Sequence, residues 1–325
     1  MTEKIKDFLS FFVRLGLSLA LLVWLFNQVN WKDIISAIKQ ADTIPLWGAF
    51  FVTVLIQFVV LIRWIVFMKA LNLEAPFGKV CRYYFIGLFC NLFLPSSIGG
   101  DVIKAVGLSR RVGQKAKVFA SVVLDRLSGF AGLVIVALVS YLIGSTIIDA
   151  PSVIVPIAIL TVLSLVIGGV LFSKRIYALG CKVFIKIPRL HKALMDMHAD
   201  VMLMKGRKRN GFGCIGLSCI IQVLGAYLYY LIGLALHIKA SFLHYLIFGP
   251  IVSAVTFLPS IGGLGVREIG WVYCLHKVGV DKELAAGLSL ISFFFMIIIG
   301  LVGGMVYVAT FSHRRVQCDP SDLKP

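Results

Sequence analysis

Long apolar runs separated by short polar segments occupy most of the chain, and this pattern predicts membrane-spanning helices. Each run is about 20 residues or longer, the length needed to cross a hydrocarbon core of about 30 Å. None shows the short alternating segments typical of a membrane β-barrel. The predicted spans are Phe8–Phe26, Pro45–Met68, Val118–Ile143, Val153–Phe172, Gly211–Leu236 and Leu284–Phe311. The sequence therefore predicts an all-α polytopic membrane protein with about six full spans.

Two further apolar stretches, Tyr83–Val106 and Phe242–Trp271, are interrupted where a span should be most regular. They contain nearly the same phrase, FLPSSIGGDVIK from Phe93 and FLPSIGGLGVRE from Phe257. Proline lacks an amide donor and glycine accepts positive φ, so each phrase predicts a helix, a break and a new helix. Each stretch is either a re-entrant hairpin or a pair of half-helices that cross the membrane, and the sequence leaves both forms open.

Composition supports a membrane location. The 325 residues are 59% hydrophobic and 14% charged, which is too apolar for a soluble domain of this size. We expect one integral membrane domain over 1–311, with a basic cytoplasmic segment at 174–210, followed by a polar tail at 312–325. The net charge of +17 is ordinary for such proteins, whose basic cytoplasmic loops contact anionic lipid headgroups. No nucleic-acid motif accompanies it, so we expect membrane lipids as partners and no nucleic acid.

The distribution of basic residues predicts the orientation. If both interrupted stretches return to the side they entered from, 24 of the 32 Lys and Arg residues lie on one side and six on the other. The protein is then expected in the inner membrane of a cell, with both termini on the cytoplasmic side. The two phrases enter from opposite sides, which predicts an inverted repeat. Interrupted segments at corresponding places in inverted repeats indicate the binding site of a transporter.

Each phrase offers candidate binding residues. A helix that starts inside the membrane presents N–H groups and a positive dipole end, which suit a phosphate or carboxylate. Lys104 and Arg267, each four residues past a Gly pair, add positive charge. Asp101 either caps the new helix or faces the substrate. In the alternative interpretation the glycines only allow close packing and the basic side chains extend to the interface.

Other charges lie within the predicted spans, where they are costly and usually paired or functional. Asp125 and Arg126 are neighbours and face different directions on a helix. We expect Asp125 to pair with Lys104 or Arg63, which leaves Arg126 for a headgroup. Arg63 either extends to the cytoplasmic interface or contributes to the site. Glu268 is either a carboxylate for a cationic headgroup or an ion-pair partner.

Three blocks, NLFLPSSIGGDVIKAVGLSRR, ASVVLDRLSGFAGL and FLPSIGGLGVREIG, resemble the lysylphosphatidylglycerol synthase transmembrane-region family, also called the flippase-like domain family. The likeness covers about Ile5 to Phe311. It implies movement of lipids between leaflets, since the family is implicated in moving aminoacylated phosphatidylglycerol and glycolipid carriers. By position it marks Pro95, Gly99, Gly100, Asp101, Lys104, Asp125, Arg126, Pro259, Gly262, Gly263, Gly265, Arg267 and Glu268. The family often has Arg where this chain has Lys104.

The lysyl-transferring members carry a large soluble C-terminal domain, whereas this sequence ends 14 residues after its last predicted span, so we expect no lysyl transfer. The leading hypothesis is a translocase that holds an anionic headgroup between the two broken helices, with no cofactor and no bound metal. One alternative is a lipid-modifying enzyme that uses Asp101, Asp125 or Glu268, although no metal-ligand or ATP-binding motif supports it. Another is a scaffold for a lipid-synthesis partner, and a homo-oligomer also fits.

Overall fold

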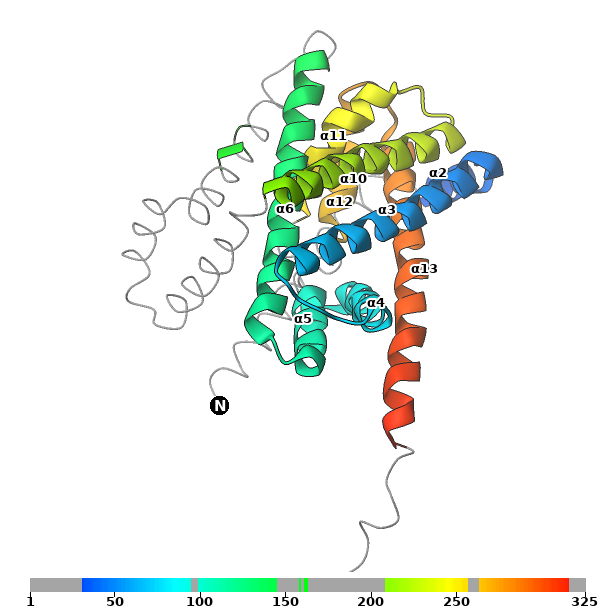
Figure 1. Cartoon of the computed structure of the whole chain (residues 1–325). Helices are drawn as coiled ribbons and strands as arrows, with labels where there is room; N and C mark the ends of the chain where they lie inside the picture. The colour runs from blue at the N-terminus through cyan, green and yellow to red at the C-terminus, as the bar shows by residue number, and fades with distance from the viewer. Residues whose placement is uncertain are drawn as a thin grey trace, which may run out of the picture.

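The structure is a computed structural model that describes residues 31–94, 99–144, 158, 161–162, 208–256 and 263–315, and every regular element within these ranges is an α-helix (Figure 1). Among the described residues, four helices are long and apolar enough to cross a membrane. They are α3 (Thr43–Ala70), α6 (Lys115–Gly144), α10 (Lys208–Ala235) and α13 (Lys282–Arg315). These helices confirm four of the predicted spans. The predicted span Phe8–Phe26, nearly all of Val153–Phe172 and most of the basic segment lie outside the described residues, as do Pro95, Pro259 and Gly262.

Each interrupted stretch forms two short helices, as predicted. The first contains α4 (Phe77–Phe93) and α5 (Gly99–Val112), and the second contains α11 (Phe242–Val255) and α12 (Val266–His276). At about 1.5 Å per residue these helices are roughly 16 to 26 Å long, which is less than a hydrocarbon core of about 30 Å. The second break is longer than the phrase predicts, because α12 begins only after the positive-φ residues Gly263 and Gly265.

Glycines let α4 and α5 pack closely. A Cβ atom on Gly100 would collide with the carbonyl oxygen of Gly87 and would lie 2.6 Å from Oδ1 of Asn91. About two turns further along α5, Gly107 lies against the ring of Tyr83. Small residues of this kind allow helix backbones to approach each other in membranes. The two short helices therefore pack side by side instead of forming one continuous rod.

A further helix, α2 (Trp31–Lys39), precedes α3 and packs against α13. Ile34 is 1% exposed and packs in a small cluster with Ala286 of α13. Ile35 and Ile38 remain exposed at 48% and 37%. Only part of the apolar face of α2 is therefore buried within the protein.

The chain passes twice through the same series of turns. α3 ends at the first residue of ALNLEAPF and α10 at the first residue of ALHIKASF, and in each string the third residue, Asn72 or His237, has a positive φ of 51° or 55°. In both turns the next N–H group donates to the carbonyl five residues earlier, at 2.9 and 2.8 Å, which closes the helix end. α5 and α12 are each followed by a positive-φ glycine, Gly113 in RVGQK and Gly279 in KVGVDK. Long helix, short helix, break, short helix, long helix is thus the order in both halves.

Packing between the halves follows the same correspondence. α4 packs on α13, and its counterpart α11 packs on α6. The counterparts α3 and α10 lie against each other and cross in front of α6 and α13 in Figure 1. Two pairs of contacts differ: α10 packs extensively on α6 and on α11, whereas α3 has few contacts with α13 and with α4. The helix contacts of the two halves therefore correspond only in part.

Candidate functional site

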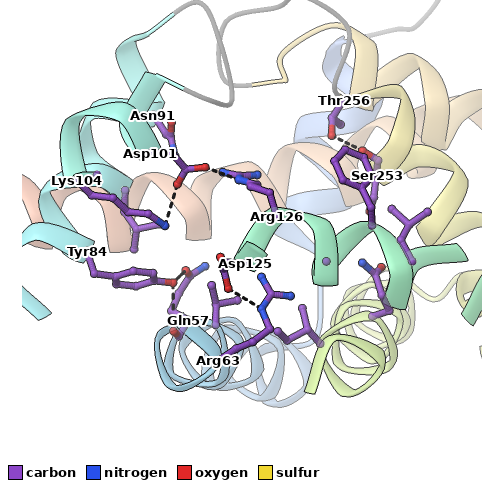
Figure 2. Close-up of a pocket in the computed structure, with 18 residues that line it drawn as sticks. Gln57, Arg63, Tyr84, Asn91, Asp101, Lys104, Asp125, Arg126, Ser253 and Thr256 are labelled. Atoms are coloured by element: carbon purple, nitrogen blue, oxygen red, sulfur yellow. Dashed lines mark hydrogen bonds and ion pairs between the residues drawn. The ribbon is translucent and has the colours of Figure 1, made fainter. Parts of the chain in front are cut away.

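Two cavities of about 280 Å³ each lie where the two halves meet. The first is lined mainly by α3, α4, α5 and α6, and the second mainly by α11, α12 and α13 with Arg126 of α6. Four of the described residues line both cavities: Asn91, Arg126, Ser253 and Thr256. The cavities therefore adjoin, and together they are called the polar hollow below. Figure 2 shows the first cavity with these shared residues.

Asp101 is the centre of the first charged cluster. Lys104 Nζ lies 2.9 Å from its Oδ1 atom, and Arg126 Nε donates to its Oδ2 atom from α6 (Figure 2). The Lys104 ammonium also lies 4.6 Å from the centre of the Trp64 ring and 5.8 Å from that of Tyr84. Such aromatic faces attract a desolvated cation. Lys104 is thus buried and held on several sides, so the alternative that it extends to the membrane interface is wrong.

A second ion pair joins α3 to α6. Arg63 Nε donates to Asp125 Oδ1 at 2.8 Å, and Arg63 Nη1 donates to the Ser218 hydroxyl of α10 at 2.8 Å. Of the two partners predicted for Asp125, the structure selects Arg63. The Arg63 residue is only 6% exposed, so it does not extend to the interface. Three helices are tied together at this point.

In the second half, Arg267 and Glu268 form a corresponding charged pair. Arg267 Nη2 lies 2.8 Å from Glu268 Oε1, and the Ser289 hydroxyl of α13 contacts both side chains. The other carboxylate oxygen of Glu268 accepts the Gly265 N–H at 2.6 Å and caps α12. Glu268 is fully buried, which supports its ion-pair role over contact with a cationic headgroup.

The expectation of free N–H groups at both helix starts needs correction. The Gly100 N–H donates to Asn91 Oδ1 at 2.8 Å, and the Gly265 N–H donates to Glu268. Asp101, instead of capping α5, accepts from two cations. Arg267 lies at the second residue of α12 and lines the second cavity. The positive charge offered to an anion therefore comes mainly from side chains.

The polar hollow carries a surplus of positive charge. Among the described residues that line it, Arg63, Lys104, Arg126 and Arg267 are basic, and Asp101 and Asp125 are acidic. Glu268 does not line the hollow but pairs with Arg267, so four basic groups face three carboxylates. The Arg126 side chain is 36% exposed, while the other three basic side chains are 6% to 9% exposed. Arg126 also lines both cavities. It is consequently the basic group best placed to meet an incoming anion.

Sequence reasoning missed several polar residues of the hollow: Gln57, Tyr84, Asn91, Ser253 and Thr256. Asn91, Ser253 and Thr256 come just before the two repeated phrases, within otherwise apolar runs. A polar residue in that position is a usable signal, because hydrocarbon disfavours it unless it has a partner. Gln57 and Tyr84 carry a weaker signal, and their hydrogen bond of 2.9 Å joins α3 to α4. Among the described residues, no three His, Cys, Asp or Glu side chains gather in a way that would hold a metal ion.

Apolar helices around buried, paired charges define a polytopic helical membrane protein with an internal polar site. The chain belongs to the family described as the lysylphosphatidylglycerol synthase TM region, which matches residues 11–304. It is also similar to the UPF0104 membrane protein PH1989 of Pyrococcus horikoshii, at 27% identity in a 268-residue alignment that covers 74% of this chain and 80% of that protein. The family resemblance expected from the sequence is confirmed.

Proposed function

We propose that this protein is a translocase that moves an anionic phospholipid or lipid-linked headgroup between the leaflets of the inner membrane. The main support is that both copies of the repeated phrase contribute to one polar hollow, with Arg126 on the wall of both cavities. A lipid phosphate suits this surplus of positive charge. Water-lined or protein-buried polar groups at membrane depth are typical of transport pathways.

The proposal assigns separate roles to the charged residues. Arg126 contacts the headgroup, and Arg267 adds positive charge from the second half. Lys104 and Asp101 hold Arg126 in position, since Asp101 bridges the two basic groups. Arg63 and Asp125 tie α3, α6 and α10 together and form the wall behind the site. No chemical change of the lipid is part of the proposal.

Exchange between leaflets follows if the two halves have inverted topology, with both termini in the cytoplasm. The matched turns after α3 and α10, and after α5 and α12, support a repeat over most of the described chain. The short helices support re-entrant hairpins, because α4 packs on α5 and α11 on α12. Rocking of one half against the other would open the polar hollow first to one leaflet and then to the other.

A leaflet-exchange assay tests the proposal. Purified protein is reconstituted into liposomes that contain fluorescent phosphatidylglycerol, fluorescent polyprenyl phosphate or fluorescent phosphatidylcholine, and a membrane-impermeant quencher reports exchange. We expect exchange of an anionic lipid to exceed that of phosphatidylcholine. Arg126→Gln should slow it by about 10- to 150-fold, the equivalent of one charge-assisted hydrogen bond of about 1.5–3 kcal/mol.

Arg82→Gln is the matched control, because Arg82 is an exposed arginine on α4 outside the polar hollow. It should exchange lipid at the wild-type rate. Arg126→Lys should give an intermediate rate, since lysine keeps the charge without the two-pronged guanidinium. Folded wild-type protein that exchanges neither anionic lipid faster than protein-free liposomes would refute the proposal. Equal rates for Arg126→Gln and wild type would remove Arg126 from the site.

A further inference from the structure

A separate apolar groove of about 190 Å³ lies between α3, α4 and α13. Its walls include Val54 and Phe58 of α3, Phe85 of α4, and Ile298 and Val302 of α13. Phe58 and Val302 are 53% and 41% exposed, so the groove opens on the outer surface of the helices. In a membrane protein this surface faces lipid.

Gln57 connects the groove to the polar hollow. It lines both spaces, and its side-chain oxygen accepts a hydrogen bond from the Tyr84 hydroxyl at 2.9 Å. Tyr84 also lines the polar hollow, beside Lys104. A molecule with a charged head and an apolar tail therefore finds a polar space and an apolar space on either side of one residue.

The corresponding surface in the other half is closed. By the order of the helices, α10 and α6 correspond to α3 and α13. α10 packs tightly on α6, where a Cβ atom on Gly132 would lie 2.7 Å from the carbonyl carbon of Ser218. The backbones of α3 and α13 come close at few points, although Phe50 of α3 packs on Phe295 of α13. The opening is thus a property of one face in this conformation and not a general gap between helices.

We propose that the groove between α3, α4 and α13 holds one acyl chain of the lipid whose headgroup occupies the polar hollow. This proposal rests on the proposed function and specifies that the substrate is a whole lipid that enters sideways from the bilayer. Along α3 the groove extends from Phe50 to Leu61, about 16 Å at 1.5 Å per residue. That length matches one leaflet of the hydrocarbon core, about 15 Å.

The groove provides an entry path for the lipid and adds little to its binding affinity. A chain that leaves the bilayer for an apolar groove exchanges one apolar environment for another, so little hydrophobic free energy is gained. The headgroup in the polar hollow supplies the attraction. Filling the groove should therefore slow lipid entry by steric exclusion.

The first test uses phosphatidylglycerol with a photoreactive diazirine in one acyl chain. After illumination in liposomes, labelled peptides of the wild-type protein should concentrate on the groove walls of α3 and α13. Arg126→Gln should lower this labelling at least fivefold, because the headgroup anchor is lost. The lipid-exposed face of α6 around Ile143 is the internal reference and should label equally in both proteins. Labelling spread evenly over exposed faces, or unchanged by Arg126→Gln, would overturn the groove proposal.

The second test fills the groove with tryptophan. Val302→Trp and Val54→Trp should each slow exchange of phosphatidylglycerol at least tenfold. Leu301→Trp and Leu55→Trp are matched controls: these neighbours are 52% and 39% exposed but do not line the groove. They should stay within twofold of wild type. Equal slowing in a control and its groove variant would overturn the proposal.

The two proposals fail in different ways. Photolabelling does not require transport. If the groove is labelled in an Arg126-dependent manner but wild-type protein exchanges no lipid, the translocase proposal fails and the acyl-chain site stands. If exchange is fast and labelling is even, the groove proposal fails and the translocase stands.

Discussion

The buried ion pair between Arg63 and Asp125 should be one of the largest single contributors to stability that a point mutation can reveal. Their side chains are 8% and 4% exposed, and Nε of Arg63 lies 2.8 Å from Oδ1 of Asp125. Arg63→Met leaves the carboxylate buried without its partner, and it also leaves the Ser218 hydroxyl without the guanidinium. Breaking a buried pair by removing one member costs about 3–5 kcal/mol.

The expected change is large enough to measure in detergent. For chains of this size each 1 kcal/mol lowers the melting temperature by about 2 °C, so Arg63→Met should melt roughly 6–10 °C below wild type. The double variant Arg63→Met with Asp125→Leu should recover most of the loss, because a buried pair replaced by apolar side chains is often neutral or stabilising. Wild type, the two single variants and the double variant form a double-mutant cycle, and thermal unfolding of each is followed by tryptophan fluorescence.

The control is Arg82→Met, which removes an exposed arginine and should leave the melting temperature within about 1 °C of wild type. Two results would refute the reasoning. One is an Arg63→Met protein that melts within 2 °C of wild type. The other is a double variant whose loss equals the sum of the two single losses, since independent sites add and a true pair does not.

Two further predictions concern the helix starts, and both are checked by thermal unfolding. Gly100→Ala should destabilise by about 1–3 kcal/mol, because its Cβ atom would strike the Gly87 carbonyl oxygen, and overpacking of a close contact has this cost. Gly78→Ala, on the same helix pair but with nothing within 4 Å of its Cβ position, should be neutral or slightly stabilising. Equal effects would contradict the packing argument. Glu268→Ala should destabilise by about 1 kcal/mol more than Glu268→Gln, because glutamine still accepts the Gly265 N–H and keeps the cap of α12. Indistinguishable variants would show that the ion pair alone carries the effect.

The polar hollow was only partly predictable. The sequence singled out Asp101, Lys104 and Arg267 because they follow a repeated Pro and Gly pattern, and all three line the hollow. It did not single out Asn91, although its place just before the first repeated phrase was a usable signal, and it did not single out Gln57, whose single amide in an apolar run gives no spacing to recognise. Their importance comes from contacts with Gly100 and Tyr84 on other helices.

The sequence by itself determined where the described helices run and where they break. An apolar run of about 20 residues, a proline or a glycine pair acts on its own segment of backbone, so its effect can be read locally. This is why four spans and both interruptions lie within the predicted stretches, although the second break is longer than its phrase predicts.

Only the tertiary structure decided which charges meet. Arg63 and Asp125 are 62 residues apart, and Asp101 and Arg126 are 25 apart. Each pairing depends on the rotation of two helices about their axes and on how closely they cross, which glycines such as Gly100 control. The same packing closed α6 on α10 but left α3 and α13 in contact at few points, such as Phe50 against Phe295.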